Sequence, residues 1–208
     1  PMEPYGYSEV GKTKFAGYHG YWPISSSKVD FRFGTNDELK SLVAEAHSHG
    51  INVLLDYVAN HVHQNHPLYQ NHPEYATPLY LPDGRMNTQL WDEQRLTTWF
   101  DTFMPSLDFG NPKVVSMMVD SAMFWMSEFN IDGFRHDACK HVNEEYWRLL
   151  TYKLKEYDPQ GKFYQIGESY GSPELMASYV NSGMLDGQFD FNVFDEATSA
   201  FNGVSGGT

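Results

Sequence analysis

Two stretches decide the fold: residues 131–137, Ile-Asp-Gly-Phe-Arg-His-Asp, and residues 163–168, Phe-Tyr-Gln-Ile-Gly-Glu. Each is an apolar segment of strand length that ends in a carboxylate, Asp137 in the first and Glu168 in the second. The separation of 31 residues between the two carboxylates leaves room for one helix. This spacing predicts a βαβ unit, whose parallel strands present both carboxylates at the same end.

The hydrophobic pattern extends this unit in both directions. Residues 1–35 are rich in Gly, Tyr, Ser and Lys and are predicted to form an irregular loop. A continuous apolar run over 51–56 is typical of a strand buried on both faces. Capping residues and helical spacing predict the other elements. These are helices from Thr35 or Asn36 to about Gly50, from Pro112 to about Phe129 and over 143–157, a short helix near Ser172-Pro173, and a last strand over 189–194.

The alternation of helices and strands predicts an α/β fold with a parallel sheet. Four strands can be counted, whereas a closed (β/α)8 TIM barrel has eight strands and usually about 250 residues. The chain is therefore expected to be an open four-stranded sheet or a part of a larger barrel. The long opening loop and the Gly-rich end, 203–208, favour a piece cut from a longer polypeptide.

The polar segment after the first strand does not fit the alternation. Its first half carries four prolines, Pro67, Pro73, Pro78 and Pro82, and the segment has no clear periodicity. Forty-odd residues are too many for a plain connection. We predict a small inserted domain or lid at 63–106, with barrel segments at 1–62 and 107–208.

Composition restricts the class of protein. The chain has 208 residues with 41% hydrophobic and 16% aromatic content, which predicts a globular domain with a real core. A formal net charge of −13 disfavours nucleic acid and anionic membrane surfaces as partners. No run of 18 apolar residues is present, so no membrane span is expected in this segment. The excess of aromatic rings suits either a carbohydrate cleft or an aromatic-rich core.

The two strand-end carboxylates have the chemistry that retaining glycoside cleavage needs. One carboxylate attacks the sugar and the other protonates the leaving oxygen. Arg135 shares a strand face with Asp137, and a guanidinium keeps a neighbouring carboxylate ionised. Glu168 follows Gly167, which is expected to leave space for a ligand. A structural salt bridge at Arg135 and an exposed strand-end glutamate at 168 are the alternatives.

Other residues at strand ends offer ligands for sugars or metals. Asp56, Asn60 and His61 end the first strand, and their oxygen and imidazole groups suit sugar hydroxyls or a hard cation such as calcium. The histidines at 61, 63, 66 and 72 fit no tight zinc spacing. The single cysteine, Cys139, excludes an internal disulfide and is not expected to be a nucleophile.

Five short motifs together carry a resemblance to a known family. Residues 56–61, 133–141 and 167–168 are similar to the first three signatures of the α-amylase family, and 104–108 is similar to the motif of its inserted domain. Residues 18–22 are similar to the loop after its second barrel strand. The motifs occur in the family's order, so the sequence resembles glycoside hydrolase family 13. The resemblance implies part of a (β/α)8 TIM barrel, about strands 3 to 6, with a small domain inserted after the third strand.

The resemblance also implies residue roles. Asp137 would be the nucleophile, Glu168 the acid/base, and Arg135 the residue that positions Asp137. Asp56 would stabilise the site from the barrel interior. Sugar-binding residues would be His19, Tyr21, Trp22 and His61 beside the scissile bond, with Lys140 and His141 on the leaving-group side. Calcium would be the cofactor, bound by Asn60 and the backbone carbonyl of His141.

Two departures from the family pattern stand out. Ser106 occupies the position at which the inserted domain usually supplies a carboxylate to calcium, although Asp108 is close by. The fourth signature, a His-Asp pair on the seventh strand that contains the third catalytic carboxylate, is absent. The 208 residues alone are therefore expected to lack activity, and the remainder of the barrel is an expected partner.

The predicted function is a retaining glycoside hydrolase that cleaves α-1,4-glucosidic bonds of starch or maltooligosaccharides. The Lys140-His141 pair favours α-amylase-like members, whereas Met104-Pro105 favours neopullulanase and cyclomaltodextrinase relatives. A transglycosylase of the same family and an inactive barrel used as a carbohydrate-binding or scaffold protein remain alternatives. A secreted, periplasmic or cell-surface location is expected, since polymeric α-glucans are usually met outside the cytoplasm.

Overall fold

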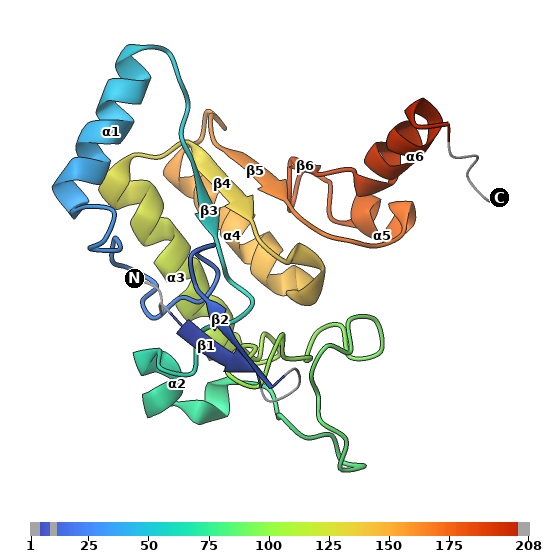
Figure 1. Cartoon of the computed structure of the whole chain (residues 1–208). Helices are drawn as coiled ribbons and strands as arrows, with labels where there is room; N and C mark the ends of the chain where they lie inside the picture. Colours follow the sequence, from blue (N-terminus) through green and yellow to red (C-terminus); the bar gives the residue numbers. More distant parts are fainter. Residues whose placement is uncertain (1–4, 9–11, 204–208) are drawn as a thin grey trace.

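The computed structural model describes residues 5–8 and 12–203 of the chain. Its centre is a four-stranded parallel sheet in the order β3-β4-β5-β6 (Figure 1). Leu54 pairs with Gly133 and Gly133 with Tyr164, so the first three strands are in register. The strands are β3 (Leu54–Tyr57), β4 (Gly133–His136), β5 (Tyr164–Gly167) and β6 (Gly187–Gln188). The predicted βαβ unit is confirmed, because α4 (Glu144–Tyr157) connects β4 to β5.

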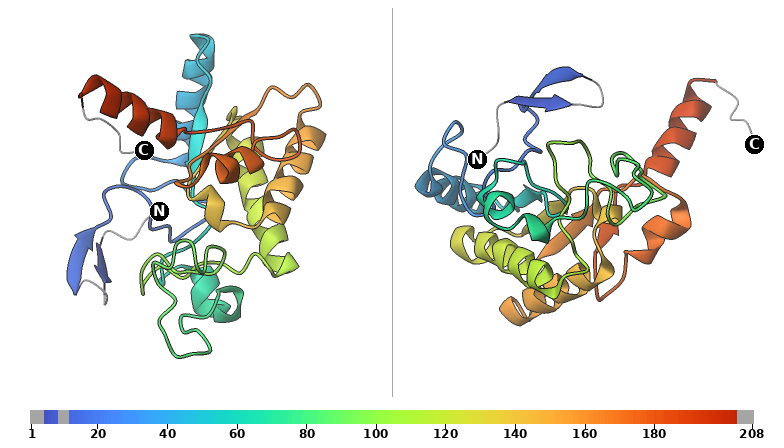
Figure 2. Two further views of the ribbon diagram at one scale, coloured as in Figure 1. Left: turned by 90° about the vertical axis from the view of Figure 1, so that its right-hand side faces the viewer. Right: turned by 90° about the horizontal axis from the view of Figure 1, so that it is seen from below.

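Side-chain caps define the long helices. Thr35 and Glu38 form a capping box at the start of α1 (Asn36–Ser48). Asn111 caps α3 (Pro112–Phe129), and this helix ends at Asn130, whose φ of 54° is left-handed. Asn143 caps α4 by accepting from the backbone NH of Glu145. These three helices follow one another around one side of the sheet (Figures 1 and 2).

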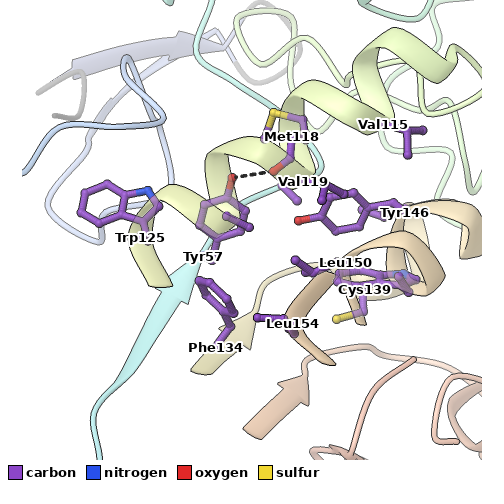
Figure 3. Close-up of a cluster of buried hydrophobic side chains, with 14 of the residues drawn as sticks. Tyr57, Val115, Met118, Val119, Trp125, Phe134, Cys139, Tyr146, Leu150 and Leu154 are labelled. Carbon is purple, nitrogen blue, oxygen red and sulfur yellow. Dashed lines mark hydrogen bonds between the residues drawn. The ribbon is translucent and has the colours of Figure 1, made fainter. Parts of the chain in front are cut away.

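The core lies between the sheet and this layer of helices. Phe134 and His136 of β4 are buried on the helix side, whereas Arg135 between them faces the other side of the sheet. Figure 3 shows Phe134 and Tyr57 packed among side chains of α3 and α4, including Met118, Leu150 and Leu154. The helix-covered face therefore stabilises the fold and leaves the opposite face free for polar side chains.

Two short elements follow β4 and β5: the turn η2 (Cys139–His141) and the helix α5 (Pro173–Ser178). The chain after α5 differs from the prediction. A strand was predicted over 189–194, but β6 ends at Gln188 and α6 (Phe191–Phe201) follows. Asp190 explains the difference, because its side chain accepts from the backbone NH of Val193 at 3.0 Å and caps the helix. Figure 2 shows α6 projecting from the sheet, and Phe194 on it is 63% exposed.

The N-terminal segment also differs from the prediction of an irregular loop. β1 (Tyr5–Ser8) and β2 (Thr13–Ala16) form an antiparallel hairpin, in which Tyr5 pairs with Ala16 and Ser8 with Thr13. Alternating bulky residues favour a strand, and the Gly, Ser and Lys content concealed this pattern. The remainder, up to Thr35, is irregular as predicted.

Segment 63–106 leaves the sheet just after β3 and returns just before α3. It contains α2 (Pro67–Asn71) and the turn η1 (Pro73–Tyr75), and it is otherwise held by isolated bridges. One bridge joins His61 to Ser106 at its base. Whether the segment is an independent domain stays a prediction.

The fold class is an α/β fold with four parallel strands, consistent with part of a TIM barrel. Across the described part of the chain, no helix combines the length and apolar character required to cross a bilayer.

Candidate active site

Asp137 and Glu168 lie side by side where β4 and β5 end. The backbone NH of Asp137 donates to Tyr57 O at 3.0 Å, and that of Glu168 donates to His136 O at 2.8 Å. The backbone NH of Cys139 then donates to Glu168 O at 2.9 Å. The parallel ladder thus continues past the strands and holds both carboxylates at one edge of the sheet, as the sequence predicted.

Arg135 joins three carboxylates on the face of the sheet that the helices leave free. Its Nη1 donates to Asp56 Oδ1 at 2.7 Å and to Asp137 Oδ1 at 3.0 Å. Its Nη2 donates to Glu168 Oε2. The Arg135 side chain is 17% exposed and that of Asp137 is 13% exposed, so the contact between these two is shielded from water, whereas Asp56 and Glu168 are more open to solvent. The guanidinium therefore fixes the positions of both strand-end carboxylates.

Burial and charge give the two carboxylates different tasks. Burial raises the pKa of Asp137, and Arg135 opposes this rise. Burial also raises the pKa of Glu168, and the negative charge of Asp137 adds to the effect. The interaction between the two carboxyl groups lowers the pKa of Asp137 and raises that of Glu168. These opposite directions favour protonation of Glu168 over Asp137, which suits an acid beside an ionised carboxylate.

Tyr21 and His19 lie on the other flank of Asp56. Tyr21 Oη donates to Asp56 Oδ2 at 3.1 Å, and its ring lies 5.4 Å from the Arg135 guanidinium carbon. The ring of His19 stacks on Tyr21 at 5.6 Å. His19, Tyr21 and Asp56 are among the residues that line a hollow of about 350 Å³. Two of the residues predicted beside the scissile bond, His19 and Tyr21, thus meet at one place.

Two predicted sugar ligands are buried instead of surface-exposed. His61 is 1% exposed; its Nε2 lies 3.0 Å from Tyr21 O and its Nδ1 lies 3.4 Å from the Asn60 amide. Burial lowers the pKa of His61 to about 4, so the ring is neutral and Nε2 donates to the carbonyl. Trp22 is 4% exposed and packs against Phe103. Sugar contact by His61 and Trp22 stays a prediction; in the structure His61 binds the backbone of Tyr21, and Trp22 also meets the ring of His19 edge to face.

A cleft of about 590 Å³ opens on one side of the carboxylate pair. Asp137 and Glu168 form part of its wall, together with Lys140 and His141. Lys140 Nζ lies 3.3 Å from Asp92 Oδ1, and His141 Nδ1 lies 2.7 Å from Arg95 O. Both predicted leaving-group-side residues therefore face the same space as the carboxylate pair.

Aromatic residues complete this cleft and were not predicted as site residues. Trp91 and Phe100 come from segment 63–106 and meet edge to face at 4.8 Å. Tyr170 lies two positions after Glu168, and its ring stacks on Phe191 at 4.7 Å. Its closeness in sequence to Glu168 is the signal that could have identified Tyr170. No periodic pattern marks Trp91 or Phe100, because they belong to an irregular segment.

Gly167 does not provide space for a ligand, contrary to the sequence-based expectation. A Cβ at this position would lie 2.7 Å from Leu185 Cδ1 and 2.8 Å from Cys139 Sγ. The close approach comes from the packing of β5 against neighbouring side chains. Glycine at 167 therefore serves the core behind the site and not substrate access.

The residues around Asn60 do not supply a carboxylate for calcium. Ser106 Oγ donates to Thr98 O at 2.7 Å and accepts from Asn60 Nδ2 at 3.4 Å. Asp108 turns away and accepts from the backbone NH of Gly110 at 2.9 Å. Within residues 5–8 and 12–203, no group of three or more His, Cys, Asp or Glu side chains could hold a metal ion. The neutral donors at Asn60 and Ser106 are a poor match for calcium, and calcium binding stays a prediction.

Comparison with known proteins agrees with this geometry. The family model for the catalytic domain of α-amylases matches residues 9–207. An α-amylase of Dictyoglomus thermophilum is 31% identical over 87% of this chain, and one of Streptomyces lividans is 28% identical over 95%. The chain spans 31% and 28% of the length of these curated relatives.

Solved structures agree with these sequence relatives. An α-amylase from Geobacillus thermoleovorans, solved in complex with acarbose, is 33% identical with a TM-score of 0.75. The match covers 86% of this chain and 39% of that one. An Anoxybacillus α-amylase is 32% identical with a TM-score of 0.77, over 89% of this chain and 40% of that one. The four-stranded sheet and its helices therefore have the arrangement of part of an α-amylase barrel.

Proposed function

The chain belongs to the family of α-amylase catalytic domains, and on that premise we propose that it is part of a retaining glycoside hydrolase. The proposed substrates are starch and maltooligosaccharides, cleaved at α-1,4-glucosidic bonds. One observation carries the proposal: Arg135 binds Asp137 and Glu168 at the ends of neighbouring parallel strands, beside a cleft of about 590 Å³. We further propose that the remainder of the barrel, in a longer polypeptide, completes the site.

The first half-reaction uses the carboxylates in different protonation states. The Asp137 carboxylate attacks the anomeric carbon and forms a covalent bond to the sugar. At the same time Glu168 donates its proton to the glycosidic oxygen, so the bond from that oxygen to the anomeric carbon breaks and the leaving sugar departs as an alcohol. Arg135 supports the attack because its positive charge keeps Asp137 ionised.

The second half-reaction reverses these roles. Glu168, now ionised, removes a proton from water, and the resulting hydroxide attacks the anomeric carbon and releases Asp137. Two inversions return the sugar to the α configuration. A sugar hydroxyl in place of water would give transfer, so the acceptor that enters the cleft decides between hydrolysis and transglycosylation.

Proton NMR of maltoheptaose with the full-length protein tests this proposal. New α-anomer signals in the first minutes are the expected result, and products longer than maltoheptaose would identify transfer. Asp137→Asn should abolish turnover while retaining oligosaccharide binding. Early β-anomer signals would contradict the retaining mechanism. Binding without any turnover by the unchanged protein would favour the carbohydrate-binding scaffold instead.

A further inference from the structure

Arg95 connects three parts of the chain that are distant in sequence. It lies in segment 63–106, and its Nη1 donates to the backbone carbonyl of Lys140 in η2. The same nitrogen donates to Tyr179 Oη at 2.6 Å, and Tyr179 directly follows α5. Tyr179 Oη in turn lies 3.4 Å from Lys140 O. One guanidinium thus joins the inserted segment to the turn after β4 and to the end of α5.

A second contact runs in the opposite direction between the same pieces. His141 Nδ1 lies 2.7 Å from the backbone carbonyl of Arg95. A carbonyl oxygen can only accept, so Nδ1 carries the proton and donates it. Arg95 and the Lys140-His141 pair therefore hold each other through both side chain and backbone. Lys140 and His141 both line the cleft beside the carboxylate pair.

The contact between Arg95 and the Lys140 carbonyl lies beside the predicted calcium site. The predicted calcium site would join the inserted segment to the backbone of His141, but Ser106 there provides a hydroxyl that is engaged with Thr98. A guanidinium supplies a permanent positive charge and five N–H donors, and so can bind carbonyl oxygens from separate chain segments. Arg95 makes this type of contact one residue away, at Lys140 O.

We propose that Arg95 is a positioning residue that anchors the inserted segment to η2 after β4 and to the end of α5 without a metal ion, and so fixes Lys140 and His141 in the cleft. The link to substrate rests on the proposed function, because it requires the cleft to hold an α-glucan. The anchoring itself does not depend on the activity. The two parts can therefore be tested separately in the full-length protein.

Arg85 provides a matched control within the same segment. Its guanidinium binds Asp83 at 2.8 Å and Glu93 at 2.6 Å, so these contacts stay inside segment 63–106. Arg85→Met removes the same charge and a comparable side chain but leaves the contacts to Lys140 and Tyr179 intact. Tyr179→Phe and Arg95→Lys test single hydrogen bonds of the anchor with smaller changes than Arg95→Met.

The experiment combines hydrogen exchange of segment 63–106 with kinetics on maltoheptaose, each with EDTA and with added calcium. Arg95→Met is expected to speed exchange over residues 87–99 and to raise KM about tenfold, with kcat near the unchanged value. Arg95→Lys and Tyr179→Phe should lie between Arg95→Met and the unchanged protein. Arg85→Met should match the unchanged protein, and EDTA should alter neither exchange nor KM.

Two results would overturn the inference. One is an Arg95→Met protein that equals Arg85→Met in exchange and KM. The other is a loss of protection with EDTA that calcium restores, which would assign the anchor to a metal. If Arg95→Met fails to fold, unchanged exchange in both Arg95→Lys and Tyr179→Phe would count against the anchor. Absence of turnover by the unchanged protein would refute the proposed function, while the exchange comparison would still decide on the anchor.

Discussion

Gly133 at the start of β4 lies against the backbone of Tyr164 in β5. A Cβ on residue 133 would stand 1.9 Å from the Tyr164 carbonyl oxygen, and the φ of Gly133 is +143°. A residue with a side chain would clash with Tyr164 at this position, and L-residues rarely adopt this φ, so only glycine fits here. Because Asp137 and Glu168 follow β4 and β5, this glycine determines how closely the strands that position the two carboxylates can pair.

Gly133→Ala is therefore expected to destabilise the full-length protein by about 3 kcal/mol or more, since the strands must separate to admit a methyl group. Thermal unfolding measures the effect. Gly161→Ala is the control, because Gly161 also has a positive φ, +65°, but a Cβ there would meet no heavy atom within 4 Å. It should cost about 1 kcal/mol. Equal losses in the two variants would show that the Tyr164 contact is unimportant.

The raised pKa of Glu168 predicts the alkaline side of the pH profile. The first half-reaction needs Glu168 protonated and Asp137 ionised, so kcat/KM should fall as pH rises through the pKa of Glu168 and as pH falls through that of Asp137. The two pKa values belong to the coupled pair. Glu168→Gln should lower kcat/KM for maltoheptaose roughly a thousandfold and abolish the alkaline limb.

A substrate with a different leaving group separates the roles of the two carboxylates. Fluoride departs without a proton, so formation of the glycosyl-enzyme from α-maltosyl fluoride should be much less impaired by Glu168→Gln than cleavage of maltoheptaose. Asp137→Asn should lose both reactions, because the nucleophile is missing. Equal damage to both substrates by Glu168→Gln would contradict its assignment as the acid.

The elements that sequence analysis located well are those with local signals. Asn111 before Pro112 and Asn143 before an acidic turn mark helix starts through contacts of two or three residues, and the structure has helices there. The strands that end at Asp137 and Glu168 follow from short apolar runs between such helices. The parallel arrangement of the carboxylates then follows from topology alone.

The features that sequence analysis missed depend on contacts between distant segments. Trp91 and Phe100 join the cleft only because segment 63–106 folds back over η2. The fit of Gly167 against Leu185 and Cys139 likewise appears only after packing. The α6 helix is an exception: its cap, Asp190, is a local signal that the alternating phenylalanines obscured. Irregular segments carry no period from which such contacts could be read.

The hydroxyl of Tyr21 is expected to contribute modestly to catalysis and its ring more strongly. Tyr21→Phe removes one hydrogen bond to Asp56 and keeps the stack on His19, so kcat/KM for maltoheptaose should fall about fivefold. Tyr21→Ala also removes the ring over Arg135 and should raise KM much further. Steady-state kinetics of both variants provide the measurement. A larger loss in Tyr21→Phe than in Tyr21→Ala would contradict this division.

Trp91 is expected to bind the leaving-group side of the substrate. It shares the cleft with Lys140 and His141 and is braced by Phe100, so its partly exposed ring can stack on a sugar. Trp91→Ala should raise KM for maltoheptaose about tenfold. It should leave α-maltosyl fluoride unaffected, because that substrate has no sugar in its leaving group.

Leu96→Ala controls for a general disturbance of the inserted segment, since Leu96 is also partly exposed there but does not line the cleft. Its KM for maltoheptaose should equal that of the unchanged protein. A rise in KM for both substrates in Trp91→Ala would instead place the ring beside the scissile bond. Unchanged KM for maltoheptaose in Trp91→Ala would show that the aromatic wall contributed by segment 63–106 does not contact the substrate. The leaving-group side of the substrate would then be bound by the sheet side of the cleft alone.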